Sequence, residues 1–256
     1  MGTKIMGQNF VAILGHRLPL DDSILNVLPD MLAPTSAPRL AVAVQHLVTV
    51  GNARRAESAR KYPSARLVSP LRADAPWVVE EPRRALYLNE RGEAAPIDPP
   101  HWEERISEQI IRIHLAEPVG WQTVSVAERL AEDSEIEVTG PCSVSLDIYR
   151  RSLTVWSGAR WGAFHGERSL HVAIRHVCRE LARAFGSPIA LYVSSYWKPV
   201  DELCIGACIE EIIAAMREAH GPPATTIESI YQKNENGTWS GDGYYIDTFV
   251  DLDDAE

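Results

Sequence analysis

The chain has 256 residues, of which 45% are hydrophobic and 23% are charged, and its formal net charge is −10. This composition is enough for a large apolar core and excludes a fibrous or intrinsically disordered chain. No apolar run approaches the roughly 18 residues of a membrane span, and no secretory signal pattern opens the chain, so we expect a cytoplasmic protein without membrane contacts. The negative charge also disfavours nucleic acid as a partner.

The first predicted elements are a buried strand and two helices. The strand covers residues 9–14, where NFVAIL is nearly continuous in apolar residues. A helix follows from a cap at Asp21 or Asp22 and ends at Pro34, because apolar residues recur between them at helical spacing. A second helix is predicted within residues 39–60.

The middle of the chain predicts mainly strands. Residues 85–89 and 94–97 flank a polar turn and predict a hairpin, and residues 108–115 alternate as one strand. A short helix is expected at residues 124–131. A second hairpin is expected from residues 144–149 and 153–156, with two arginines at its turn.

The last hundred residues give the clearest patterns. Residues 169–185 predict an amphipathic helix with one apolar face and one arginine face, ended by Gly186 as a left-handed cap. Residues 189–193 predict a strand that is covered on both faces, because the run is almost wholly apolar. The remaining predicted elements are a helix and two strands, at residues 208–219, 226–232 and 244–252.

This order of elements predicts an α+β fold with a mixed or largely antiparallel sheet and helices packed against it. We expect one compact domain over residues 1–256. The breaker-rich region near residues 62–82 is the candidate boundary, and it would separate an N-terminal helix and strand part (1–76) from the main sheet-containing part (77–256).

Charge is sorted along the chain. Residues 39–72 and 150–183 are rich in arginine, whereas residues 199–256 carry thirteen carboxylates against Arg217 and Lys233. Such a distribution predicts an acidic surface near the end of the chain and arginine-rich patches elsewhere. Fields of this kind steer and select partners more than they determine a fold.

The function expected from this charge pattern is protein binding. An acidic surface would dock a basic partner, for example as a bacterial immunity protein that neutralises a toxin. The expected contacts are the carboxylates of Asp242, Asp247 and Asp251, with Trp239 and Tyr244 as apolar anchors. Homo-oligomerisation is left open, and no cofactor is expected.

The alternative is a hydrolase or transferase for an anionic small molecule. A histidine and a carboxylate could provide a general base, and arginine side chains could bind a carboxylate or phosphate of the substrate. The candidate catalytic residues are His165, Glu167, Arg168 and His171, with Arg175 or the pair His16 and Arg17 as further anion contacts.

A metal site is not expected. Cys204 and Cys208 lie four residues apart and could bind zinc with His176 and Cys178, but Gly206 interrupts the helix between the two cysteines. The sequence also has no phosphate-binding loop, dinucleotide fingerprint, H-E-x-x-H or G-x-S-x-G motif.

Overall fold

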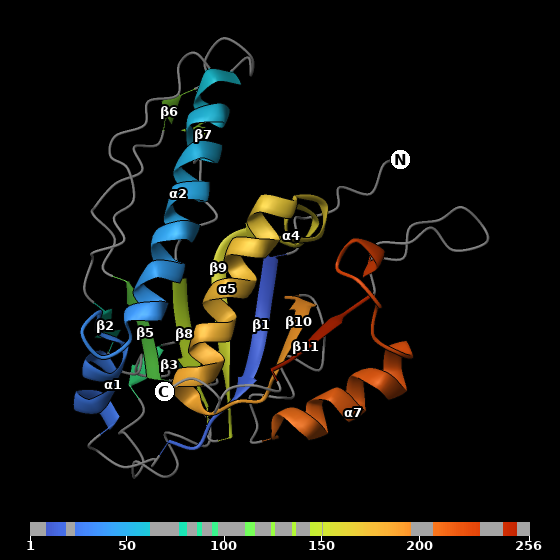
Figure 1. Cartoon of the computed structure of the whole chain (residues 1–256). Coiled ribbons are helices and arrows are strands. Elements are labelled where there is room, and N and C mark those ends of the chain that lie inside the picture. The colour runs from blue at the N-terminus through green and yellow to red at the C-terminus, as the bar shows by residue number, and fades with distance from the viewer. Residues whose placement is uncertain are drawn as a thin grey trace.

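The structure is a computed structural model that describes residues 9–18, 24–61, 77–80, 86–88, 94–96, 111–115, 124–125, 135–136, 144–149, 151–195, 207–230 and 243–249. Its centre is an open seven-stranded sheet in which every neighbouring pair is antiparallel (Figure 1). From one edge to the other the strands are β11 (Tyr245–Thr248), β10 (Ile189–Ser194), β1 (Asn9–Gly15), β9 (Ser152–Arg160), β8 (Val144–Ile148), β5 (Ile111–Leu115) and β2 (Trp77–Glu80). The predicted α+β fold is confirmed.

Helices cover both faces of this sheet. The first face carries α1 (Ile24–Leu32), α2 (Pro38–Lys61), α4 (Trp161–Gly166) and α5 (Arg168–Phe185), whose buried side chains share one core cluster. The second face carries α7 (Ile209–His220), which packs with a separate, smaller cluster. No helix among the described segments is long and apolar enough to cross a membrane.

Residues 10–14 of β1 are all apolar because helices cover both faces of the sheet at this strand. Phe10, Ala12 and Leu14 belong to the core under α2 and α5, whereas Val11 and Ile13 belong to the core under α7. All five side chains are at most 1% exposed. The neighbouring strand β10 alternates in the same way, so the prediction that it is covered on both faces is confirmed.

Two predicted hairpins are confirmed. One is β3 (Leu86–Leu88) with β4 (Ala94–Pro96), and the other is β8 with β9. The expected helix at residues 124–131 is wrong at its start, because Val124–Ser125 form strand β6 and pair with β7 (Glu135–Ile136). The pairing places Val124 opposite Ile136, and β-branched side chains of this type favour strands.

The expected strand at residues 226–232 is also wrong. Glu228–Ile230 form a short 3₁₀ helix, η1. Thr226 and Ser229 bond each other's backbone: the Ser229 N–H donates to Thr226 Oγ1 at 3.2 Å and the Thr226 N–H donates to Ser229 Oγ at 3.0 Å. These local bonds occupy the backbone N–H groups of Thr226 and Ser229, which in a strand would be available to a neighbouring strand.

A close approach fixes η1 against the start of β11. A Cβ at Gly243 would overlap the carbonyl group of Ile230, so only glycine fits at this position without a shift of the backbone. The chain before β11 is further held by a hydrogen bond from the Ala224 N–H to the Tyr244 carbonyl at 2.8 Å. Both η1 and β11 contact α5 through charged side chains, namely Glu228 with His171 and Asp247 with Arg175.

Candidate functional site

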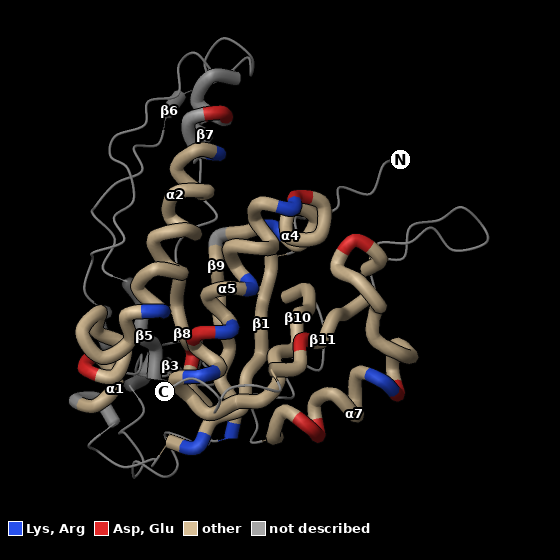
Figure 2. Tube along the Cα trace, viewed as in Figure 1, with Lys and Arg blue, Asp and Glu red and all other residues tan. Residues whose placement is uncertain are grey.

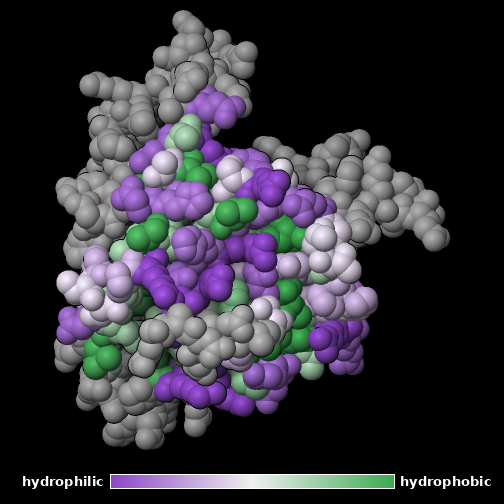
Figure 3. All heavy atoms as spheres, in the orientation of Figure 1, coloured by the Kyte–Doolittle hydropathy of each residue, from purple (hydrophilic) through white to green (hydrophobic). Residues whose placement is uncertain are grey.

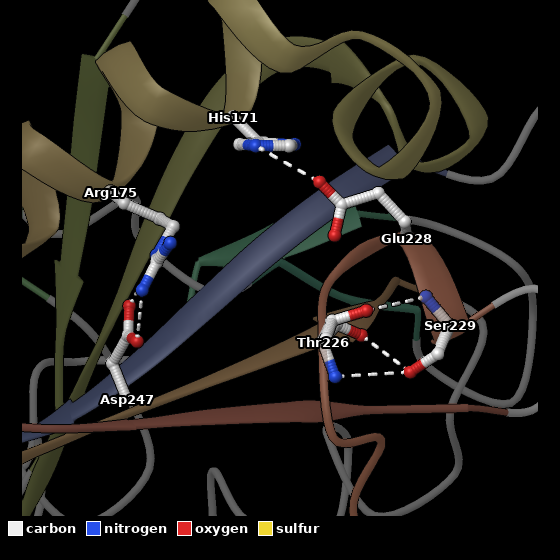
Figure 4. Close-up of polar contacts among 6 residues, drawn as sticks. All are labelled: His171, Arg175, Thr226, Glu228, Ser229 and Asp247. Atoms are coloured by element: carbon white, nitrogen blue, oxygen red, sulfur yellow. Dashed lines mark hydrogen bonds and ion pairs between the residues drawn. The ribbon is translucent and has the colours of Figure 1, made fainter.

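The main polar contact between α5 and β11 is a bidentate ion pair between Arg175 and Asp247. Arg175 Nε donates to Asp247 Oδ2 at 2.7 Å, and Arg175 Nη2 donates to Asp247 Oδ1 at 2.5 Å (Figure 4). The Asp247 side chain is only 9% exposed and that of Arg175 is 35% exposed. The hydrogen bond to this carboxylate raises the pKa of Arg175 above its usual range, so the guanidinium stays protonated.

Two stacked tyrosine rings lie on one side of this ion pair. The Tyr245 ring centroid lies 5.4 Å from Arg175 Cζ, and Tyr192 stacks on Tyr245 with ring centroids 6.1 Å apart. Burial raises the pKa of the Cys178 thiol and of the Tyr192 phenol, and the nearby Asp247 carboxylate raises both further. Both groups therefore stay protonated, and neither is an activated nucleophile.

A second contact joins α5 to η1. His171 Nε2 lies 3.7 Å from Glu228 Oε1; the histidine side chain is 6% exposed and the glutamate side chain 64% (Figure 4). Desolvation lowers the pKa of His171, and the charges of Arg175 and Arg168 lower it further, while Glu228 raises it. The neutral imidazole is therefore the form that the folded protein favours.

The four candidate catalytic residues do not share one set of contacts. His165 is half-buried and lies edge-on to Trp161, with ring centroids 6.1 Å apart. Glu167 pairs with Arg54 of α2 at 2.8 Å. Arg168 is exposed, and His171 faces Glu228 in place of Glu167. The structure thus pairs the histidine and carboxylate differently from the sequence-based expectation.

His16 makes backbone contacts at the end of β1. The Leu18 N–H donates to His16 Nδ1 at 3.3 Å, so the proton lies on Nε2, which donates to the Tyr149 carbonyl at 2.7 Å. Desolvation lowers the pKa of His16, which keeps this neutral form. Both ring nitrogens of His16 are occupied by backbone hydrogen bonds. These bonds explain the position of His16, and no bound substrate is needed to explain it.

Two of the five predicted partner contacts lie in the described part of the chain, and both are buried. Tyr244 is 1% exposed and its hydroxyl donates to the Gly221 carbonyl at 2.7 Å. Asp247 is neutralised by Arg175. Trp239, Asp242 and Asp251 lie outside the described residues, and their role in partner binding stays a prediction.

Three of the exposed carboxylates that the structure describes lie on α7. Its N-terminal turn carries Glu210 and Glu211 and its last turn carries Glu218 beside Arg217, as the coloured positions in Figure 2 show. Glu211 accepts the Cys208 N–H at 2.8 Å and lies 3.1 Å from Arg151. The signal that could have identified this face is the seven-residue spacing of Glu211 and Glu218, which places both on one helical stripe.

Small residues separate these carboxylates. Ala214 and Ala215 are exposed and occupy the middle of the outer face of α7, whereas Ile212, Ile213 and Met216 are buried against the sheet. Glu211 and Glu218 are about 10 Å apart along the helix axis, from the rise of 1.5 Å per residue. The outer face of α7 therefore has short alanine side chains in its middle and carboxylates at both ends.

The cysteines and histidine considered for zinc do not come together. Cys178 lies in the core under α5, whereas Cys208 lies at the start of α7 on the opposite face of the sheet. Cys204 is outside the described residues. Within the segments that the structure describes, no group of three or more His, Cys, Asp or Glu side chains could hold a metal ion.

The outer face of α7, with its exposed carboxylates and central alanines, is thus the described surface that best fits a charged partner. Comparison of the chain with protein-family models, with curated proteins and with solved structures found no match.

Proposed function

We propose that the chain is a cytoplasmic bacterial protein that binds a basic protein partner through the acidic outer face of α7. A toxin-neutralising immunity protein is the concrete setting, because an acidic surface complements the basic active site of a nuclease-type toxin. The observation that carries the proposal is the exposure of Glu210, Glu211 and Glu218 around two alanines on one helix.

Charge supports a basic partner. Over residues 207–230 the carboxylates of Glu210, Glu211, Glu218 and Glu228 are all exposed, and Arg217 is the one arginine or lysine in that range. A surface with this excess attracts cationic partners at long range and repels anionic ones, which raises the association rate and the selectivity.

The shape of the face supports close contact. Alanine loses no side-chain rotamer freedom when it is covered, so a partner can approach Ala214 and Ala215 without that cost. The carboxylates of Glu210 and Glu218 can then pair with lysine or arginine at the rim of the interface, whereas Glu211 is held by the Cys208 N–H and Arg151. Trp239, Asp242 and Asp251 remain proposed additions to this surface, whereas Asp247 contributes by holding β11 to α5.

The enzyme alternative gains no support from the described contacts. Glu167 is paired with Arg54, and His171 with Glu228, so the intended acid–base pair is not formed. Arg175, the expected anion contact, is occupied by Asp247.

The test is a charge reversal on α7 that spares Glu211, because that side chain caps the helix. A partner is first captured from native lysate and identified by mass spectrometry, and its Kd is then measured by calorimetry at several salt concentrations. We expect Glu210→Lys with Glu218→Lys to weaken binding by about tenfold or more and to reduce its salt dependence, because two attractions become repulsions.

The matched control is Arg217→Glu on the same helix, which should leave the affinity unchanged or increase it. An affinity and salt dependence unaffected by the double reversal would refute the proposal. Circular dichroism of each variant establishes that α7 still forms.

A further inference from the structure

The outer faces of α2 and α5 form one continuous surface. The ring centroids of His46 on α2 and His176 on α5 are 6.4 Å apart in an edge-to-face arrangement. The two helices lie side by side and run in opposite directions (Figure 1). The start of α2 therefore lies towards the same end of this surface as the end of α5.

Two valines on this surface are unusually open to solvent. Val42 on α2 is 63% exposed and Val172 on α5 is 44% exposed, and they are two of the three large hydrophobic side chains that are exposed among the described residues. Figure 3 shows isolated hydrophobic positions among hydrophilic ones on this face of the molecule. Exposed apolar side chains within a charged surface favour a contact that buries both kinds of group.

Three exposed arginines border these valines. Arg39 precedes Val42 by three residues on α2. On α5, Arg168 precedes Val172 by four residues and Arg179 follows it by seven. These spacings place each arginine on the same helical stripe as its valine. The α2–α5 strip is defined here as Arg39, Val42, Arg168, Val172, His176 and Arg179.

The outer face of α7 has the complementary pattern. Its exposed alanines, Ala214 and Ala215, lie between the carboxylates of Glu210 and Glu218. These two glutamates are about 12 Å apart along the helix axis, and Arg168 and Arg179 are about 16 Å apart along α5. Each surface thus has apolar side chains in its middle and charge at both ends, and the two surfaces carry charge of opposite sign.

We propose that the α2–α5 strip of one copy of the chain binds the outer face of α7 of a second copy. Glu210 and Glu218 pair with the arginines at the two ends of the strip. The short alanine side chains let α7 approach the exposed valines closely, at no cost in side-chain rotamer freedom. Contact between two strips, or between two α7 faces, would bring like charges together, so unlike surfaces are the favoured combination.

Such a contact is head-to-tail. The strip lies on the first face of the sheet and α7 lies on the second, so every pair of copies leaves one surface of each kind free and further copies can add in the same sense. The inference rests on the α7 face of the proposed function and adds a second occupant for it. A copy bound at α7 competes with the basic partner, so partner binding dissociates the copies from each other.

Sedimentation velocity of the full chain over a range of protein concentrations tests the contact. We expect the weight-average mass to rise with concentration and to fall when salt screens the charges. The strip variant, Arg39→Gln with Arg179→Gln, and the helix variant, Glu210→Gln with Glu218→Gln, should each weaken self-association by about tenfold or more. The control Arg217→Gln removes a positive charge from α7 itself and should leave self-association unchanged or strengthen it.

Mixing the strip variant with the helix variant identifies the surfaces that meet. The first keeps an intact α7 face and the second keeps an intact strip, so an equimolar mixture should associate as tightly as the wild type but stop at the dimer. The strip variant should also bind the basic partner at least as tightly as the wild type, since its α7 face is unchanged. Loss of the self-contact is in this way measured separately from loss of the proposed function.

Three results would overturn the proposal. A wild-type chain that stays monomeric up to about 1 mM would show that the two surfaces do not bind each other. Self-association that persists unchanged in the helix variant would show that α7 takes no part in it. A mixture that associates no better than either variant alone would exclude a contact between unlike surfaces. Circular dichroism establishes that both variants fold, since all four substituted side chains are exposed.

Discussion

Asp247 and Arg175 show how the position of a charged residue in the fold decides its role. The carboxylate lies on β11 and the guanidinium on α5, and each neutralises the other in a largely buried contact. Such a pair contributes little net stability compared with apolar packing, but removing one partner leaves a charge without compensation. The pair joins β11, whose register is set by its pairing with β10, to α5.

We predict that Arg175→Met lowers the free energy of unfolding by about 2–3 kcal/mol, less than for a fully buried pair because the arginine is partly exposed. Urea denaturation measures this value. The control Arg179→Met, at an exposed position one turn away, should change it by about 0.5 kcal/mol or less. Similar losses in the two variants would contradict an important role for the ion pair.

His171 makes the stability depend on pH. Its pKa in the folded protein is lowered from the ordinary histidine value of 6.5, chiefly by desolvation, so the folded state binds fewer protons than the unfolded state once the pH falls below about 6.5. The free energy of unfolding should therefore decrease as the pH falls through 6.5 towards the lower folded pKa.

We predict that His171→Leu, which keeps the site apolar and removes the titrating group, flattens this decrease between about pH 7 and pH 5. Urea denaturation at several pH values measures the slope. Part of the slope should remain, since burial lowers the pKa of His16 and His165 as well. An unchanged slope in His171→Leu would exclude this histidine as its source.

At the scale of elements, the end of α5 depends on one backbone conformation. Gly186 has φ 70°, and its N–H bonds the carbonyls of Ala182 and Arg183. A side chain at this position meets open space, with only Arg17 Cδ at 4.0 Å, so the cost of replacing glycine is conformational.

We predict that Gly186→Ala destabilises the protein by about 1–2 kcal/mol and that Gly186→Asn costs less, because asparagine tolerates the left-handed region better. Thermal unfolding measures both. Gly166→Ala is the matched control, since Gly166 ends α4, has no positive φ and would bring an added Cβ within 4 Å of no other atom. Equal losses at the two glycines would contradict the assigned role of the cap.

Elements with strong periodicity were predictable, whereas short elements were found only where a turn signal marked them, as in the hairpin of β3 and β4. The spacing of apolar residues identified α2, α5 and α7 almost to the residue. It missed β2 and α4, since four or six residues carry too little periodic signal. It misassigned η1 because side-chain bonds of Thr226 and Ser229 compete with strand pairing.

At the scale of the whole molecule, the sheet separates two kinds of surface. The outer face of α7 carries glutamates, and the outer face of α2 and α5 carries arginine and histidine. Two independent clusters of buried side chains bind the helices to the sheet, and β1 and β10 contribute to both.

The sequence by itself determined the α+β class, the long helices, the doubly covered strands β1 and β10, and the local cap at Gly186, because these depend on periodicity and on backbone preferences of single residues. The tertiary structure alone decided which charges are available to a partner. Asp247 and Tyr244 stand in the acidic part of the sequence, yet the fold buries both, pairing the first with Arg175 and the second with Gly221. Pairing between residues 72 or 23 positions apart depends on how strands and helices meet in space, and no local pattern records it.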